Sequence, residues 1–146
     1  MEDVVLLRLP PMKFRGFGRL NSRSEIPNNM TFVHLAEIAH ARSGDKGNHA
    51  NVGVIAYTPA GFAFLGRYLT EARVAEYLLP LRPRQVERFE MPGIMAYNFL
   101  LHDVLAGGAS RSLRTDSQGK VLAAAVLEMQ IPVPPNLNEM RKPDTK

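Results

Sequence analysis

The chain has 146 residues, of which 45% are hydrophobic and 22% are charged, and these values fit one compact globular domain. The absence of cysteine excludes disulfides, thiol nucleophiles, iron–sulfur clusters and cysteine-based zinc sites. No apolar run approaches the roughly 18 residues of a membrane span. Residues 1–11 lack the basic start of a signal peptide. We therefore expect a cytoplasmic protein that does not bind membranes.

The net charge of +4 is concentrated near the two ends of the chain. Residues 30–133 hold ten basic and nine acidic side chains, so this central part is almost neutral. A nucleic-acid-binding protein instead carries a basic patch on its folded surface, often with aromatic side chains for stacking. The charge distribution therefore does not favour a nucleic-acid partner.

Breaker residues divide the chain into three parts. Residues 1–29 contain Pro-Pro, Gly-Phe-Gly and Pro-Asn-Asn and are expected to form a poorly structured leader. This leader is either an arm that docks on a partner subunit or a stretch upstream of a true start at Met30. Residues 30–133 form the expected folded domain, and the Pro-rich, polar residues 134–146 a flexible tail.

The central domain is expected to alternate between strands and helices. In chain order, the pattern predicts a strand over residues 32–41, a polar loop over 42–50, a strand over 51–57, a helix over 59–79, a strand over 86–91, a helix over 94–106 and a strand over 121–133. Thr58 and Pro59 are a favourable helix start, and Gly107-Gly108 is a favourable helix end. Every second residue from Val121 to Val133 is apolar, which is typical of a strand with one buried face.

This β-β-α-β-α-β order predicts the α+β class. Helices beside a mostly antiparallel sheet indicate a two-layer sandwich that is a variant of the ferredoxin-like fold. One face of such a sheet can stay uncovered by helices. The apolar character of the elements indicates that this face packs on another subunit, so we expect a homo-oligomer.

The polar loop is dense in functional groups. Its charged side chains and its glycines, which allow close backbone approach, favour an anion site. The ligand-binding candidates here are Arg42, Ser43, Gly44, Lys46, Gly47, Asn48 and Asn51, and Asp45 is a candidate catalytic base. A tight hairpin in which Asp45 and Asn48 bond their own backbone explains the same residues equally well.

Asn98 and His102 lie four residues apart, on one face of the second expected helix. Because that helix is apolar nearly all round, both must be hydrogen bonded if buried. Either they are a satisfied core pair, or Asn98 binds a ligand and His102 is an acid–base catalyst facing the polar loop. Arg114 is a further anion-binding candidate, although its segment also fits a solvated edge strand.

Several other chemistries lack their motifs. The four histidines form neither an H-x₃-H nor an H-E-x-x-H pattern, so no metal is expected. Neither a Walker A loop nor a G-x-S-x-G sequence is present, and a dinucleotide fingerprint does not link a strand to a helix. We therefore expect no cofactor.

Two segments resemble the C-terminal module of the acyclic terpene utilisation protein A (AtuA-like) family. They are ARSGDKGNHANVG over residues 41–53, and NFLLH over residues 98–102 followed by Gly107-Gly108 and residues 110–120. The resemblance covers about residues 32–133 and implies a ferredoxin fold. That module usually follows a large domain in the same chain. The resemblance therefore implies a separately encoded large partner subunit, and catabolism of branched or terpenoid acyl compounds as coenzyme A thioesters, without implying a particular reaction.

Three functions are compatible with these features. The chain is a small subunit that completes an anionic ligand site on a larger partner, or an assembly module without chemistry of its own. A free-standing hydratase or lyase that uses His102 or Asp45 as its base ranks third, because a general base needs a pocket that the sequence does not reveal.

Overall fold

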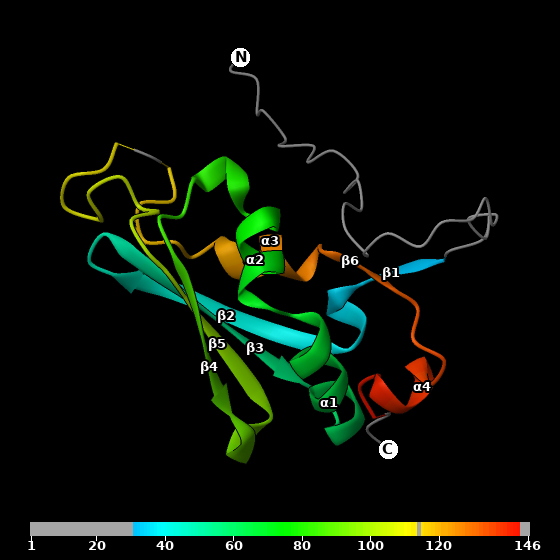
Figure 1. Cartoon of the computed structure of the whole chain (residues 1–146). Helices are drawn as coiled ribbons and strands as arrows, with labels where there is room; N and C mark the ends of the chain where they lie inside the picture. The colour runs from blue at the N-terminus through cyan, green and yellow to red at the C-terminus, as the bar shows by residue number, and fades with distance from the viewer. Residues whose placement is uncertain (1–30, 114, 144–146) are drawn as a thin grey trace, which may run out of the picture.

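A four-stranded antiparallel sheet with the strand order β2-β3-β5-β4 forms the centre of the fold (Figure 1). The computed structural model describes residues 31–113 and 115–143, so the expected leader and Arg114 lie outside the described residues. β2 (Ala39–Lys46) and β3 (His49–Ala56) form one hairpin, and β4 (Val86–Met91) and β5 (Ala96–Leu101) form another. Since β3 and β4 both run antiparallel to β5, they are parallel to each other, as in a split β-α-β unit.

Helices cover one face of this sheet (Figure 1). α1 (Pro59–Tyr68), α2 (Glu71–Tyr77) and α3 (Leu122–Leu127) share a single apolar core with the sheet. β1 (Phe32–His34) and β6 (Gln130–Pro132) pair separately, and α4 (Leu137–Met140) lies near the C-terminus. Three short 3₁₀ turns, η1 (Leu35–Glu37), η2 (Leu79–Leu81) and η3 (Pro92–Ile94), connect the elements.

The alternation of side chains along β3 separates the two faces. Ala50, Val52 and Val54 are fully buried under the helices. The residues between them point to the opposite face, where they are partly exposed, and they are His49, Asn51, Gly53 and Ile55. In β5, Phe99 and Leu101 are likewise fully buried. We call the surface that the helices leave uncovered the open face.

The predicted helix over residues 94–106 is wrong. Residues 96–101 form β5, at the centre of the sheet between β3 and β4. A continuous apolar run fits a buried strand as well as a buried helix, and periodicity alone does not separate them. Gly107 and Gly108 have positive φ angles, but they belong to the loop after β5 and do not end a helix.

The predicted strand over residues 121–133 is wrong over most of its length. Residues 122–127 form α3, and only residues 130–132 form a strand, β6. All six residues of this segment are apolar, so the spacing of apolar residues does not define a strand here, and the high helix propensity of alanine and leucine favours a helix.

Three boundaries also differ from expectation. The predicted strand over 32–41 is interrupted by η1, so that β1 leaves the main sheet to pair with β6. The helix over 59–79 breaks near Thr70, whose hydroxyl accepts a hydrogen bond from the Arg73 backbone N–H and caps α2. Thr58 caps α1 as expected, with Pro59 as its first residue.

The predicted polar loop over residues 42–50 lies mostly in strands. Residues 42–46 belong to β2 and residues 49 and 50 to β3, so only Gly47 and Asn48 form the turn. Gly47 has a φ of +67°, which favours glycine in this two-residue hairpin. The polar residues are therefore held on a rigid ladder.

The predicted α+β two-layer architecture with antiparallel sheets is confirmed despite these changes. Residues 137–140, within the expected tail, form α4, and its Met140 is buried. None of the helices in the described part of the chain has the length and apolar character needed to cross a bilayer.

Two consecutive leucines of β5 test the orientation of the sheet. Leu101 is fully buried under the helices, whereas Leu100 lies on the open face and is partly exposed. We expect Leu101→Ala to lower the free energy of unfolding by about 2–5 kcal/mol and Leu100→Ala by about 1 kcal/mol. Urea denaturation measures both values, and equal losses would contradict the assignment of faces.

Candidate functional site

Two glycines remove side chains from neighbouring positions of the open face. Gly44 in β2 pairs with Asn51, and Gly53 in β3 pairs with Arg42. A Cβ atom at Gly53 would lie 3.8 Å from the Asn98 Oδ1 atom, and one at Gly44 would lie 3.9 Å from the Asn51 Oδ1 atom. Both glycines are partly exposed and carry no side chain, and we call the patch formed by Gly44, Gly53, Asn51 and Asn98 the glycine trough.

An asparagine pair forms the floor of the glycine trough. The Asn51 Nδ2 atom donates a hydrogen bond to the Asn98 Oδ1 atom at 3.2 Å, which links β3 to β5 on the open face. Both side chains are partly buried. The trough therefore has a fixed polar base that can form further hydrogen bonds.

Three cationic side chains lie beside the trough at its β2 edge. Arg42 and Lys46 flank Gly44 on the same face of β2 and stand about 13 Å apart at the strand repeat. The Lys120 Nζ atom lies 3.7 Å from the position of a Gly44 Cβ atom. Among the described residues, none of the three has a carboxylate ion-pair partner. Positive charges without a carboxylate partner beside a patch that lacks side chains suit an anion.

Lys120 was missed by the sequence analysis. It follows a turn and lies 76 residues from Gly44 in the chain, so no local pattern connects the two. The signal is a long-range contact: the Ser43 hydroxyl donates a hydrogen bond to the Lys120 carbonyl at 3.1 Å and fixes this loop against β2.

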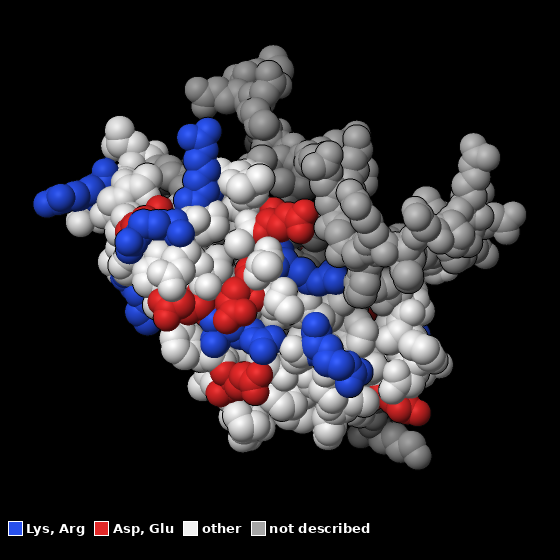
Figure 2. Space-filling view, viewed as in Figure 1, with Lys and Arg blue, Asp and Glu red and all other residues white. Residues whose placement is uncertain are grey.

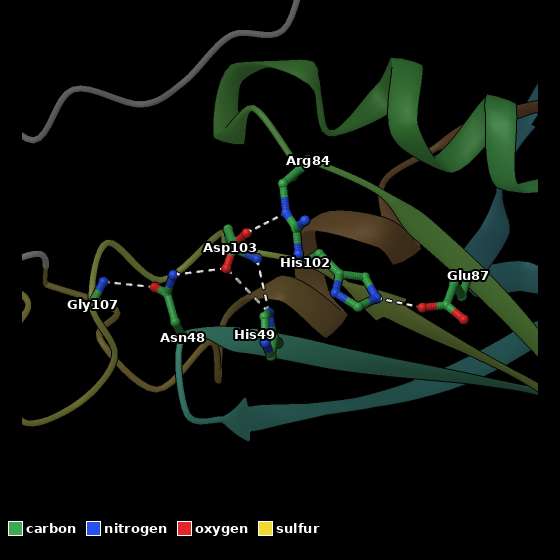
Figure 3. Close-up of polar contacts among 7 residues, drawn as sticks. All are labelled: Asn48, His49, Arg84, Glu87, His102, Asp103 and Gly107. Carbon is green, nitrogen blue, oxygen red and sulfur yellow. Dashed lines mark hydrogen bonds and ion pairs between the residues drawn. The ribbon is translucent and has the colours of Figure 1, made fainter.

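Two histidines lie beside each other at one end of the open face (Figure 3). The rings of His49 and His102 are 4.9 Å apart between centroids. The His102 Nε2 atom lies 2.5 Å from the Glu87 Oε1 atom, and its buried Nδ1 atom has no hydrogen-bond partner among the residues that the structure describes. The His49 Nδ1 atom accepts a hydrogen bond from the Asp103 backbone N–H, so the proton of a neutral His49 is on Nε2.

Asn48 connects the β2–β3 turn to the loop after β5 (Figure 3). Its side chain donates to the Asp103 Oδ1 atom at 3.0 Å and accepts from the Gly107 N–H at 2.6 Å. Its carbonyl accepts from the Leu105 N–H at 3.1 Å. These three bonds hold a loop in which Asp103 and Ala106 have positive φ angles. Asn48 thus maintains the shape of the site.

The Asp103 carboxylate completes this connection. Arg84 donates to its Oδ2 atom at 2.6 Å, and this hydrogen bond, together with the charge of Arg84, outweighs the effect of desolvation and holds the pKa of Asp103 below its ordinary value of 3.8. The hydrogen bond from Asn48 acts in the same direction. Asp103 therefore stays ionised in mildly acidic solution.

Two of the predicted site residues lie on the helix-covered side of the sheet. The Ser43 hydroxyl accepts a hydrogen bond from the Ala123 N–H at 2.9 Å, so a side chain of β2 caps the start of α3. Asp45 pairs with Ala50, which is buried under the helices, whereas His102 belongs to the open face. Asp45 and His102 are thus separated by the sheet, and Gly47 lies in the turn away from the trough.

The rest of the described surface provides weaker candidates for a ligand site. In the view of Figure 2, acidic and basic side chains are interspersed without a large area of one sign. A separate groove between α1 and the C-terminal segment is mostly apolar and contains none of the predicted residues. Among the described residues, no cluster of three His, Asp or Glu side chains has the arrangement of a metal site.

Ser43→Ala tests whether this hydroxyl serves the fold. We expect a loss of about 1 kcal/mol in the free energy of unfolding, which is typical of a lost helix cap. Ser110→Ala, an exposed serine, is the matched control and should cost much less. Equal unfolding midpoints for both variants in urea would show that the cap has no energetic role.

The lowered pKa of Asp103 predicts a pH dependence of stability. A carboxyl whose pKa is lower in the folded state contributes stability above its unfolded pKa, near 3.8, and loses it as the pH falls through the folded value. The stability advantage of the wild type over Asp103→Asn should therefore shrink below about pH 4. Urea denaturation of both proteins measures this difference between pH 7 and about pH 2.5, which is roughly one unit below the reference pKa. A stability difference that stayed constant over this range would contradict the prediction.

Comparison with known proteins identifies the domain. A family model described as the AtuA ferredoxin-like domain matches residues 33–132. A search of curated proteins and a search of solved structures each found no significant match. The family match spans the sheet, the helices that cover it and the glycine trough with the three cations beside it. The chain therefore belongs to the AtuA ferredoxin-like domain family.

Proposed function

We propose that this chain is a small subunit that binds the anionic part of an acyl-coenzyme A thioester on its open face. The observation that carries the proposal is the position of Lys120 over the gap at Gly44, with Arg42 and Lys46 on either side. Phosphate and carboxylate groups are the ligands that such side chains bind best. The floor of Asn51 and Asn98 supplies hydrogen bonds that orient a ligand.

The shape of the trough favours a shared site over an independent one. It lies on one open face of a sheet, whereas a small-molecule pocket encloses most of its ligand. A larger AtuA-type subunit, encoded separately, would cover the open face and supply the other wall. The acyl group, branched or terpenoid, would then lie between the two chains in a catabolic reaction.

Binding is better supported than catalysis by this chain alone. The His102 Nδ1 atom is buried and does not reach a ligand on the open face without a movement of its surroundings. Asp45, the other candidate base, belongs to the opposite side of the sheet. His102 and Glu87 instead fit a supporting role, in which they orient or relay protons for groups supplied by the partner.

An assembly module without chemistry is the second candidate. Exposed apolar side chains at the β4 side favour it, since Phe89, Met91 and Ile94 are 48%, 45% and 55% exposed. Both roles can exist in one chain, because the cations beside the trough lie along β2, at the opposite edge of the sheet from β4.

Calorimetric titration with coenzyme A tests the ligand site. Lys120→Ala removes one charge-assisted contact, worth about 1.5–3 kcal/mol, so we expect binding to weaken by about tenfold or more. Lys142→Ala removes the same charge from the C-terminal segment and should leave the affinity unchanged. Equal affinities for both variants, or no binding of coenzyme A by the wild type, would contradict the proposed site and leave the assembly role.

A further inference from the structure

The outer edge of β4 presents unpaired backbone groups. In the β3–β5 ladder the Ala56 N–H donates to the Met95 carbonyl, so the odd-numbered residues of β5 bond to β3 and the even-numbered ones bond to β4. The β4 partners of those even-numbered residues are odd-numbered. The N–H and C=O groups of Val86, Arg88 and Glu90 therefore point away from the sheet.

Nothing in the described part of the chain covers this edge. β4 is the last strand of the sheet, with only β5 beside it (Figure 1). Phe89 and Met91 lie on its open face, and Ile94 follows in the turn. Exposed apolar side chains along an unpaired edge are the features by which sheets pair with another strand.

We propose that two copies of this chain pair through β4 in an antiparallel arrangement with the two Phe89 residues on the twofold axis. The result is a continuous eight-stranded sheet, in which each copy contributes four strands. The contact is isologous, as is usual for homodimers.

The charges of β4 select this register. The outward-pointing groups are on even-numbered residues, so even positions must face even positions across the axis. With Phe89 on the axis, Arg88 of each copy, which already forms an ion pair with Glu90 of its own chain at 3.1 Å, faces Glu90 of the other copy, so opposite charges meet. In the register with Arg88 on the twofold axis, the two copies of Arg88 face each other. In the register with Glu87 on the axis, the two Glu87 carboxylates face each other.

The side chains on the open face agree with the same register. The two Phe89 rings face each other at a position without direct hydrogen bonds, where opposing Cα atoms are only about 4.5 Å apart. Glu87 of one copy faces Met91 of the other, so no like charges meet. Each phenylalanine thus loses contact with water.

The absence of cysteine in the chain allows a precise test of register. Phe89→Cys places two thiols across the axis, within the Cα separation of about 4.4–6.8 Å that a disulfide needs. Met91→Cys is the matched control on the same face of the same strand. Its two copies would stand about 13 Å apart, because each Met91 faces Glu87 of the other chain.

We expect mild oxidation to convert Phe89→Cys to a species of twice the chain mass on non-reducing gels, with Met91→Cys remaining at single mass. Two short strands bury little area, so a weak dimer is expected and covalent trapping is the sensitive readout. Glu90→Arg, added to Phe89→Cys, sets like charges opposite each other and should reduce the trapped fraction. Equal trapping at both positions, no trapping at Phe89, or no effect of Glu90→Arg would overturn the proposal.

The result is independent of the ligand site. Phe89 pairs with Asn98 of the trough, but the variants above lie on β4 and change neither the trough residues nor the cations beside β2. A chain that binds coenzyme A but is not trapped through Phe89 would refute only the pairing. A chain that is trapped but binds no coenzyme A would refute only the ligand site.

Discussion

The period-two alternation of β3, fixed on both sides by hydrogen-bonded neighbours, is the constraint on which the rest of the structure depends. Its even-numbered residues are alanines and valines that form the centre of the core. Its odd-numbered residues must then lie on the open face. A shift of one residue in either ladder would bury His49 and Asn51 and expose the valines. The apolar core therefore determines where the polar site can be.

The dense polar segment after β2 serves two separate purposes. Ser43 caps α3, and Asn48 holds a loop that contains strained backbone angles. Their hydrogen-bonding groups are used within the fold, because turns and helix ends leave backbone groups that require partners. Arg42 and Lys46 are exposed on β2 and have no carboxylate partner among the described residues. The sequence left a structural hairpin and a ligand site as alternatives. Ser43 and Asn48 fit the first interpretation, and Arg42 and Lys46 fit the second.

Local patterns predicted some of the fold and missed the rest for identifiable reasons. The strand over residues 86–91 and the Thr58-Pro59 helix start follow from short-range preferences and are confirmed. The apolar run over residues 96–101 predicts a helix, but these residues form a central strand. A central strand can be apolar at consecutive positions, so it lacks the apolar–polar alternation that marks a half-buried strand. Every second residue from Val121 to Val133 is apolar, yet residues 122–127 form a helix whose start is capped by Ser43, about 80 residues away in the chain. Lys120 was overlooked for the same reason, since its place beside Gly44 depends on the tertiary fold.

The central claim is that residues 96–101 pair with β3 and thereby bring Asn98 beside Gly53. Nuclear Overhauser effects measured on the isotope-labelled protein test it directly. In the antiparallel ladder, Gly53 and Asn98 form a pair without direct hydrogen bonds, so their Cα protons approach closely. A strong cross-peak between the Cα protons of Gly53 and Asn98 is expected. Medium-range effects between residues i and i+3 along residues 96–101, without that cross-peak, would indicate a helix. That result would remove the basis of both the trough and the open face.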